Sequence, residues 1–265
     1  MARKMKTAER APGTILQQMY LNERLARREM RAGRFLDLGA GTGHASSVLL
    51  ARGWQGVGID LNETACAKNS ATNQQYVVEG SYEVRHGDFL AMPDLGRADL
   101  VVSSMVLEHL EDQATDTFFA VARTALGAVG SLVLMVPGSP RHWGIEDEIA
   151  GHIRRFDEHS VREELHRNGF KEDHVAGLTF PISNVLLPLS NFLVKRAERQ
   201  RVDLSQHDRT VLAGDRQVLF KTAYPAPFHW VLNTTSMYPF HTLQKVFRHR
   251  PSALVVYAEA HPAKN

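Results

Sequence analysis

Short, nearly continuous runs of apolar residues alternate with stretches of helical spacing over most of the chain. The apolar runs predict strands at 35–38, 56–59, 82–86, 98–103 and 131–136. After each run the apolar residues recur at helical spacing, as between Phe118 and Ala125. Apolar strands that alternate with helices are typical of a parallel sheet covered on both faces. The pattern therefore predicts an α/β fold that is Rossmann-like and doubly wound, with a mostly parallel sheet of seven strands.

The two ends of the chain depart from this alternation. A helical pattern begins at Thr14, and further strands are predicted near 172–178 and at 253–258. The residues between these last two strands have no strand–helix rhythm but contain amphipathic and helix-like pieces at 182–199 and 203–217. We expect an N-terminal helical segment at 1–32 that closes over a cofactor, a sheet domain at 33–178 and 252–265, and a mostly helical cap inserted at 179–251 before the last strand.

One helix boundary carries a specific signal. Ser160 is followed three positions later by Glu163, which is the pattern of a capping box, and Gly169 is suited to the end of the same helix. The pattern predicts that Ser160 is the N-cap of a helix that ends at Gly169.

Composition narrows the class of protein. The chain has 265 residues, of which 43% are hydrophobic, and its 31 basic and 29 acidic side chains leave a net charge of +2. This balance argues against a protein that wraps nucleic acid. The one cysteine, Cys66, excludes an internal disulfide and a cysteine-built zinc site, and suits a small buried side chain. Because neither a secretory signal nor an apolar run of membrane-spanning length is present, we expect a cytoplasmic protein without stable membrane insertion.

A glycine-rich loop, Asp37-Leu-Gly-Ala-Gly-Thr-Gly43, joins the first predicted strand to the next helix. Such a loop lets a ligand lie against the backbone at a helix N-terminus. Asp60 closes the second predicted strand, where a carboxylate accepts hydrogen bonds from both hydroxyls of a ribose. Asp37 would repel a pyrophosphate and attract the ammonium of an amino-acid moiety. The loop also lacks the G-x-G-x-x-G spacing of a dinucleotide site, so these features disfavour NAD(P).

The segment FLDLGAGTGHASSVLLARGWQGVGIDLN resembles the first two motifs of class I S-adenosylmethionine-dependent methyltransferases. The similarity continues through HGDFL at 86–90, ADLVVSSMVLEHL at 98–110, GSLVLMVPG at 130–138 and GHIRRFDEHSVREELHRNGF at 151–170. Within this family the chain is most similar to the small-molecule methyltransferases of the ubiquinone-biosynthesis type. The resemblance implies S-adenosylmethionine as cofactor and methyl transfer to an O or N atom of a small molecule, in secondary metabolism or cofactor biosynthesis.

The resemblance also implies which residues bind the cofactor. The methionine part is expected to contact Asp37, Gly39, Ala40, Gly41 and Gly43, and the nucleoside Asp60, Leu61, Asp88 and Phe89. The carboxylate and sulfonium are expected to face Ser103 and Met105. Tyr20 and Arg24 of the N-terminal helix are expected either to close over the cofactor or to serve helix packing.

The acceptor side has candidates of several kinds. His109 or Glu108, just beyond the fourth predicted strand, is expected to take the acceptor's proton. Alternatively, Glu108 orients a base, or Glu108 caps and His109 packs. His152 and Arg155 are expected to contact the substrate or to pair with the acidic run at 146–148. In the inserted region Phe228, Trp230 and Tyr238 are expected to line the acceptor pocket, with His229, Asn233, His241 and Gln244 as orienting polar groups. Since no His-Glu-x-x-His motif or carboxylate triad is evident, we expect no metal.

Other functions stay open beside this one. A Rossmann oxidoreductase that uses NAD(P) is disfavoured by the loop, and a scaffold protein of methyltransferase-like fold is disfavoured by the intact acidic residues. A methyltransferase acting on protein or tRNA is disfavoured by the balanced charge and by Ser103-Ser104-Met105-Val106, which replaces the Asn/Asp-Pro-Pro-Tyr/Phe signature. The inserted region has alternatives as well, because it suits a homodimer interface or contact of Lys195, Arg196 and Arg199 with anionic lipid.

Overall fold

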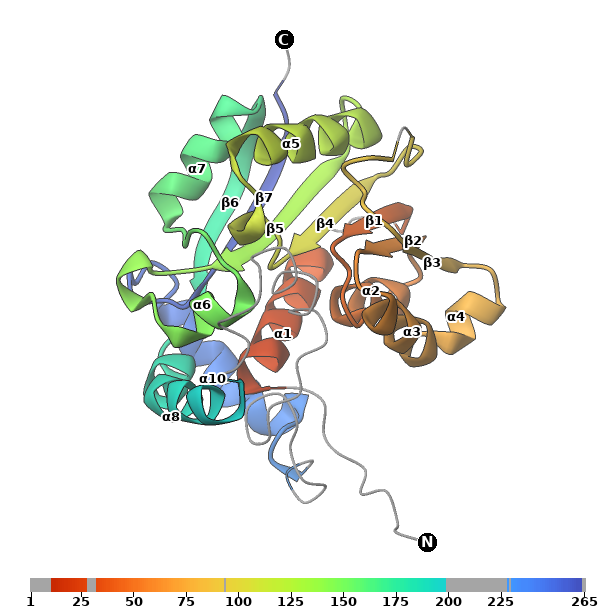
Figure 1. The fold of residues 1–265 in the computed structure, drawn as a ribbon. Helices are drawn as coiled ribbons and strands as arrows, with labels where there is room; N and C mark the ends of the chain where they lie inside the picture. The colour runs from red at the N-terminus through yellow and green to blue at the C-terminus, as the bar shows by residue number, and fades with distance from the viewer. Residues whose placement is uncertain (1–10, 28–31, 93, 199–227, 229, 264–265) are drawn as a thin grey trace, which may run out of the picture.

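A seven-stranded sheet forms the centre of the molecule (Figure 1). The computed structural model describes residues 11–27, 32–92, 94–198, 228 and 230–263. The strands follow the order β3-β2-β1-β4-β5-β7-β6, and β7 alone runs antiparallel to its neighbours. This confirms the predicted Rossmann-like, mostly parallel sheet. The strands are β1 (Arg34–Leu38), β2 (Gln55–Asp60), β3 (Tyr82–His86), β4 (Leu100–Ser104), β5 (Ser131–Pro137), β6 (Phe170–Leu178) and β7 (Val255–Pro262).

Helices cover both faces of the sheet (Figure 1). One face packs against α5 and α7, and the other packs against α1 and α2. The helices are α1 (Pro12–Arg27), α2 (His44–Leu50), α3 (Glu63–Thr72), α4 (Gln74–Val78), α5 (Asp112–Leu126), α6 (Ile145–Ala150), α7 (Glu158–Arg167), α8 (Ile182–Glu198) and α10 (Thr234–Val246), with 3-10 turns η1 (Leu107–His109) and η2 (Pro140–His142).

The alternation of side chains along β1 decides where its acidic residue points. Leu36 and Leu38 are buried in the layer of α5, whereas Phe35 is buried in the layer of α1 and α2. Successive side chains of a strand point to opposite faces of the sheet. Asp37 therefore points to the same face as Phe35, toward α2, and lies beneath the glycine loop.

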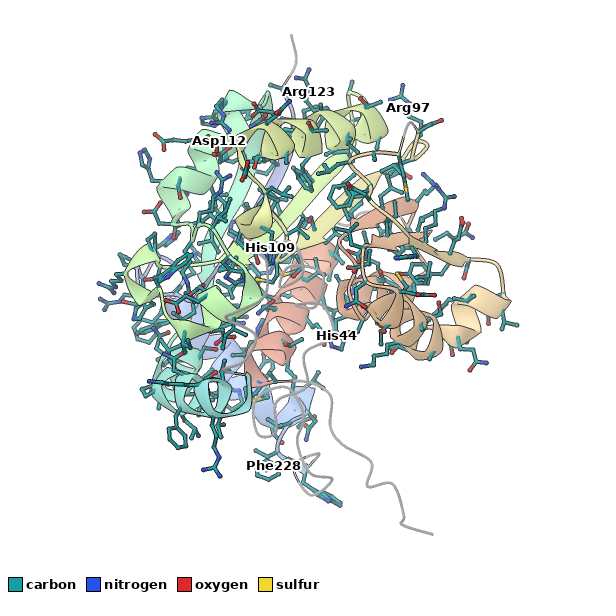
Figure 2. All side chains as sticks on the ribbon, in the orientation of Figure 1. His44, Arg97, His109, Asp112, Arg123 and Phe228 are labelled. Carbon is teal, nitrogen blue, oxygen red and sulfur yellow. The ribbon has the colours of Figure 1, made fainter. Side chains whose placement is uncertain are left out.

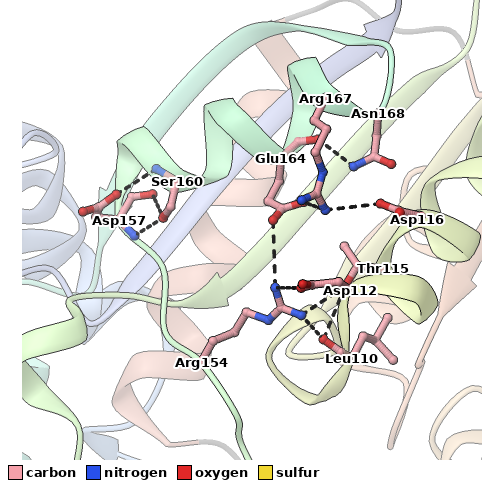
Figure 3. Close-up of polar contacts among 10 residues, drawn as sticks. All are labelled: Leu110, Asp112, Thr115, Asp116, Arg154, Asp157, Ser160, Glu164, Arg167 and Asn168. Atoms are coloured by element: carbon pink, nitrogen blue, oxygen red, sulfur yellow. Dashed lines mark hydrogen bonds and ion pairs between the residues drawn. The ribbon is translucent and has the colours of Figure 1, made fainter.

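The start of α7 differs from its prediction (Figure 3). Asp157 is the N-cap, and its Oδ1 accepts the backbone N–H of Ser160 at 2.8 Å. Ser160 lies inside the first turn, where its Oγ accepts the N–H of Asp157 at 2.9 Å. The prediction of Ser160 as N-cap is wrong because aspartate caps a helix as well as serine does and the reciprocal pair satisfies two backbone donors.

The described part of the inserted region is helical and packs on the N-terminal helix. It lies between β6 and β7 and contains α8 and α10, whereas the predicted helical piece at 203–217 lies outside the described residues. Glu23 of α1 accepts hydrogen bonds from His241 Nε2 at 2.7 Å and from Lys245 Nζ at 2.8 Å, both on α10. Among the helices that can be described, none combines the length and the apolar character that crossing a membrane requires.

Candidate functional site

The loops after the strands and the helices of the inserted region enclose a cavity of about 1600 Å³. It opens at the carboxyl ends of β1 and β4, adjacent strands whose connections leave in opposite directions, which is where open α/β sheets bind ligands. His109 lies near the centre of the molecule, and Phe228 lies at the far end by the inserted helices (Figure 2). Pockets for a single small ligand usually have volumes of about 300–1000 Å³. This cavity therefore has room for two ligands side by side.

The glycines of the loop have separate roles. Gly41 has a φ of +51° and lines the cavity, and no heavy atom lies within 4 Å of where its Cβ would be. Gly39 has a φ of +76°, and a Cβ there would lie 2.2 Å from Val106 Cγ2. Gly43 has a φ of +81° and packs against Asn69 of α3 instead of lining the cavity. Its predicted cofactor contact stays a prediction, and the structure adds a packing role, because a Cβ would meet Asn69 Oδ1 at 2.1 Å.

Asp37 lines the cavity with a carboxyl that is only partly satisfied. Its Oδ2 accepts a hydrogen bond from Ser46 Oγ at 2.6 Å, whereas its Oδ1 is buried and has no partner. Burial raises the pKa of this carboxyl to about 7. A buried acceptor without a donor destabilises the fold by about 1–3 kcal/mol, and more when it is charged. Asp37 Oδ1 can therefore accept a hydrogen bond from a donor, or pair with a cation, that enters the cavity.

Asp60 both lines the cavity and shapes the loop. Its Oδ2 accepts the N–H of Gly41 at 2.7 Å and its Oδ1 accepts the N–H of Asn62 at 2.8 Å. Burial raises the pKa of this carboxyl. A carboxylate oxygen has more than one lone-pair site, so both oxygens keep capacity for hydroxyl donors. Leu61 and Ala40 also line the cavity beside it.

Asp88 and Phe89, after β3, form another part of the wall. Asp88 is exposed, and its Oδ1 accepts the N–H of Leu90 at 2.9 Å. Phe89 is buried and packs edge-on against Phe118, with 6.0 Å between ring centroids. The structure therefore brings both predicted residues to the cavity.

The end of β4 contributes Ser104 and Met105 to the cavity, but not Ser103. Ser103 is buried, and its Oγ donates to the carbonyl oxygen of Leu38 at 2.8 Å. The predicted contact of Ser103 with the cofactor stays a prediction. Side chains alternate along a strand, and the next residue is the one that faces the cavity. Met105 has a φ of +59°. Such strain in a non-glycine residue costs about 1–3 kcal/mol and concentrates at functional sites.

The N-terminal helix lines the cavity with a face other than the predicted one. Tyr20 donates to or accepts from His174 Nε2 at 2.8 Å, and Arg24 forms two hydrogen bonds with buried Glu259 at 2.7 and 2.8 Å. Neither side chain lines the cavity, so the structure favours helix packing for both. Residues three or four apart share a face of a helix, and the stripe that reaches the cavity is the neighbouring one. It consists of Gly13, Thr14, Gln17, Gln18 and Leu21.

Glu108, His109 and His152 form a polar cluster in the cavity wall. Glu108 is 0% exposed, and neither of its carboxylate oxygens has a hydrogen-bond partner. Its Oε1 lies 3.8 Å from His152 Nε2, and the rings of His109 and His152 lie 4.9 Å apart. Burial raises the pKa of the Glu108 carboxyl to about 7 and lowers the pKa of the His109 imidazole to about 3.

Backbone and side-chain contacts bring the segment that carries His152 onto the segment that carries His109. The N–H of Ile153 donates to the carbonyl oxygen of Glu108 at 2.8 Å, and His109 Nδ1 lies 3.3 Å from the carbonyl oxygen of Gly151. Arg154 binds the carbonyl oxygen of Leu110 and contacts Asp112 Oδ1 at 3.1 Å (Figure 3). The sequence analysis did not predict this role of Arg154. The only feature of the sequence that marked the residue was its position next to a second arginine, Arg155.

The side chain of Asp147 contacts two residues of the same segment. Its Oδ1 contacts His152 Nδ1 at 2.8 Å and accepts from Arg155 Nε at 2.7 Å. Its Oδ2 accepts the N–H of Gly144 at 2.9 Å. His152 and Arg155 therefore pair with the acidic run, and both also line the cavity.

The inserted region supplies the apolar wall, with some aromatic residues other than those predicted. Phe228 lines the cavity, whereas Trp230 is 85% exposed, Tyr238 is 60% exposed and neither reaches it. Their contact with the acceptor stays a prediction, and from α10 it is Met237 and Phe240 that line the cavity. The other apolar lining residues here are Ile182, Leu186, Leu187, Leu189, Leu193, Val231 and Leu232.

The polar residues predicted to orient the acceptor have contacts within the fold. His241 binds Glu23, and Gln244 accepts the N–H of Thr179 at 2.9 Å and donates to the carbonyl oxygen of Leu16 at 3.1 Å. Asn233 is the N-cap of α10. His229 lies outside the described residues.

Comparison with known proteins places the chain among methyltransferases. The family model for a methyltransferase domain matches residues 16–175. A candidate sarcosine dimethylglycine methyltransferase from Galdieria sulphuraria is 14% identical, with 93% of this chain and 85% of that chain covered and a TM-score of 0.57. Magnesium protoporphyrin IX methyltransferase from Synechocystis PCC 6803, solved with bound S-adenosylhomocysteine, is 18% identical, with 63% and 77% covered and a TM-score of 0.53.

A third similar structure is the pyocyanin biosynthetic protein PhzM. It is 20% identical, with 61% of this chain covered and a TM-score of 0.50, and the match spans 52% of its length, about half. No curated protein matches the sequence. At these identities the solved structures establish the fold, and the family model establishes the family.

Proposed function

The chain belongs to the methyltransferase domain family, as a class I enzyme that uses S-adenosylmethionine, and from this we propose that it methylates a small molecule with a large apolar part. The observation that carries the proposal is the division of the cavity into two unlike ends. One end presents Asp37, Gly41 and Asp60, and the other presents the apolar side chains of α8 and α10.

The residues at the polar end fit the cofactor. The unpartnered Oδ1 of Asp37 suits the ammonium of the methionine moiety, since a cation satisfies a buried carboxylate. The open space at Gly41 lets the ligand lie against the backbone, and Asp60 beside it has acceptor capacity for the ribose hydroxyls. Leu61, Asp88 and Phe89 would then enclose the adenine, with Met105 beside the sulfonium.

The apolar end fits the acceptor. Once a cofactor fills the polar end, a large part of the 1600 Å³ cavity remains, lined mostly by leucine, isoleucine, valine and phenylalanine side chains. A pocket of this kind binds an apolar body and orients it with a few polar groups. Glu108, His109 and His152 are the polar cluster of this wall, so the O or N atom to be methylated is proposed to lie there.

The bound cofactor supplies a methyl group on a sulfonium that is already a strong electrophile. The chain's own residues then have to position the acceptor atom and accept its proton. Glu108 and His109 are proposed to receive that proton, because both line the same cavity as Met105. The helices α1, α8 and α10 are proposed to exclude water as a lid and cap.

Two neighbouring structures bear the names of small-molecule methyltransferases, which supports a small acceptor here. An NAD(P)-dependent oxidoreductase is disfavoured by Asp37, whose buried carboxyl would face a pyrophosphate. An acceptor of tRNA or protein is disfavoured because the apolar wall lines a concave cavity and suits a compact molecule.

Calorimetry with separate ligands tests the proposal. We expect S-adenosylmethionine and S-adenosylhomocysteine to bind with micromolar Kd values, equivalent to about 7–8 kcal/mol, and NAD⁺ and NADP⁺ not to bind. Apolar phenols, alcohols and amines are then screened for formation of S-adenosylhomocysteine. A protein that binds NAD⁺ but neither sulfur ligand would overturn the assignment.

A further inference from the structure

We propose that Glu108, His109 and His152 bind a Zn²⁺ ion, and that this ion holds a hydroxyl group of the acceptor. The inference deepens the proposed function and rests on it for the identity of the ligand's hydroxyl, but not for the binding of the ion. Each side chain offers one ligand atom, and these atoms all lie within 4.8 Å of one another.

The spacing of the cluster is close to that of a zinc site. Bonds of about 2.0–2.1 Å in a tetrahedral site place the ligand atoms about 3.4 Å apart. Glu108 Oε1 and His152 Nε2 are already 3.8 Å apart. A small approach of side chains that line an open cavity completes the site.

The state of Glu108 is an independent observation that points to a cation. Its side chain is fully buried, and both carboxylate oxygens lack a hydrogen-bond donor. Buried charged groups are otherwise paired or bound to metal ions. A divalent ion in the cavity would satisfy the carboxylate that the fold leaves without a donor.

Both histidines are oriented in the way that metal ligands are. His152 Nδ1 contacts Asp147 Oδ1 at 2.8 Å, and His109 Nδ1 lies 3.3 Å from the carbonyl oxygen of Gly151. A metal-bound histidine almost always donates its other N–H to a carboxylate or carbonyl, which fixes the ring and its tautomer. These contacts make Nε2 the metal-binding nitrogen of each ring.

The types of ligand atom in the cluster favour zinc over magnesium or calcium, and their number suggests what the ion does. Two imidazoles and one carboxylate suit zinc, whereas magnesium and calcium prefer oxygen ligands. Three protein ligands leave a fourth position open, as in catalytic zinc sites. With the ion bound, Glu108 and His109 act as its ligands and no longer receive the acceptor's proton. A hydroxyl oxygen held at the open position would instead lose its proton to solvent at a lower pH, since zinc lowers the pKa of a bound hydroxyl group as it does that of water. The proposal thus favours a hydroxyl-bearing acceptor over an amine.

This site could not be predicted from the sequence, because its ligands do not follow a metal-binding motif. Glu108 and His109 are adjacent in the chain, and His152 reaches them only through the contacts of Ile153 and Arg154.

Metal titration of the full-length protein tests the site. The protein is dialysed against a chelator, titrated with Zn²⁺ by calorimetry, and titrated with Co²⁺ while its visible absorption is recorded. We expect one ion per chain and the absorption bands of four-coordinate Co²⁺. Glu108→Gln and His152→Ala should each weaken Zn²⁺ binding by at least tenfold, since even loss of an outer partner costs about 10–100-fold. His159→Ala is the matched control, because His159 is exposed, pairs with Glu163 and does not line the cavity.

Binding of S-adenosylhomocysteine by the same samples separates this proposal from the proposed function and reports folding. Unchanged Zn²⁺ affinity in both variants, or no Zn²⁺ binding by the wild type at millimolar concentration, would overturn the metal site while the function stands. If neither variant binds S-adenosylhomocysteine, the wild-type Co²⁺ spectrum decides. Four-coordinate bands support the site, and the spectrum of the aqueous ion refutes it.

Discussion

At the scale of single residues, we expect Asp37 to make cofactor binding depend on pH. Burial raises the pKa of its carboxyl to about 7, whereas the cofactor's ammonium favours the ionised form. Affinity for S-adenosylhomocysteine should therefore fall as pH decreases below about 7, by up to about tenfold per pH unit. Calorimetry between about pH 5.5 and 7.5 measures the profile, and Asp37→Asn should bind weakly with a flatter one. A wild-type profile as flat as that of the variant would contradict the role of Asp37.

The same carboxyl affects the stability of the ligand-free protein. Because its pKa is raised from 3.8 to about 7, its contribution is fully present below pH 3.8 and is lost as pH rises through about 7. Asp37→Asn should remove this part of the decline and stabilise the ligand-free protein above about pH 7. Urea unfolding at several pH values compares the two proteins, and equal slopes of unfolding free energy against pH would count against the prediction.

The proposed role of Asp60 in cofactor binding is tested by substitution. Asp60→Ala should weaken both S-adenosylmethionine and S-adenosylhomocysteine, because each hydrogen bond to a charged acceptor contributes about 1.5–3 kcal/mol. The loss should be about tenfold or more in Kd by calorimetry. Asp94→Ala is the matched control, since Asp94 likewise accepts a backbone N–H, from Gly96 at 2.7 Å, but does not line the cavity. Equal effects of the two substitutions would remove Asp60 from the binding site.

At the scale of elements, α1 is attached to the sheet by one face and lines the cavity with another. Arg24→Met should destabilise the protein by about 3–5 kcal/mol, because it leaves the buried carboxylate of Glu259 without its cation. It should leave the affinity for S-adenosylhomocysteine unchanged, since Arg24 does not line the cavity. Chemical unfolding and calorimetry provide the two measurements.

The control for this prediction is Arg27→Met on the same helix. Arg27 is exposed and pairs with Glu23 one turn away, so its loss should cost less than about 1 kcal/mol. A weaker cofactor affinity in Arg24→Met than in Arg27→Met, at temperatures where both are folded, would restore the expectation that Arg24 closes over the cofactor.

At the scale of the whole molecule, the inserted region is proposed to act as a cap over the acceptor. Replacing residues 185–230 with a short Gly/Ser linker keeps α10, which Glu23 and Gln244 attach to α1 and β6. The variant should keep cofactor binding but lose methyl transfer, because the apolar wall from α8 is removed. Near-normal transfer to an acceptor found by screening would show that the region serves assembly or lipid contact instead.

The sheet and the cofactor loop could be read from the sequence because their signals are local. Strand periodicity located β1 to β5, and the glycines with Asp37 and Asp60 belong to consecutive strand–turn–helix units. In such units the chain itself brings the residues to one edge of the sheet. Their neighbours along the same segments were harder to assign, as Ser103 and Gly43 show, because a step of one residue turns a side chain to another face.

Only the tertiary structure decided which distant residues meet. Glu108 and His109 contact His152 because Ile153 and Arg154 bind the turn after β4, and no periodicity predicts such contacts. The inward face of α10 was likewise settled by its packing on α1, which leaves Tyr238 on the surface. The sequence by itself determined the family, the sheet and the loop residues at the end of the cavity proposed for the cofactor, since these depend on local pattern. The end proposed for the acceptor depends on long-range packing, and the structure alone decided which residues line it.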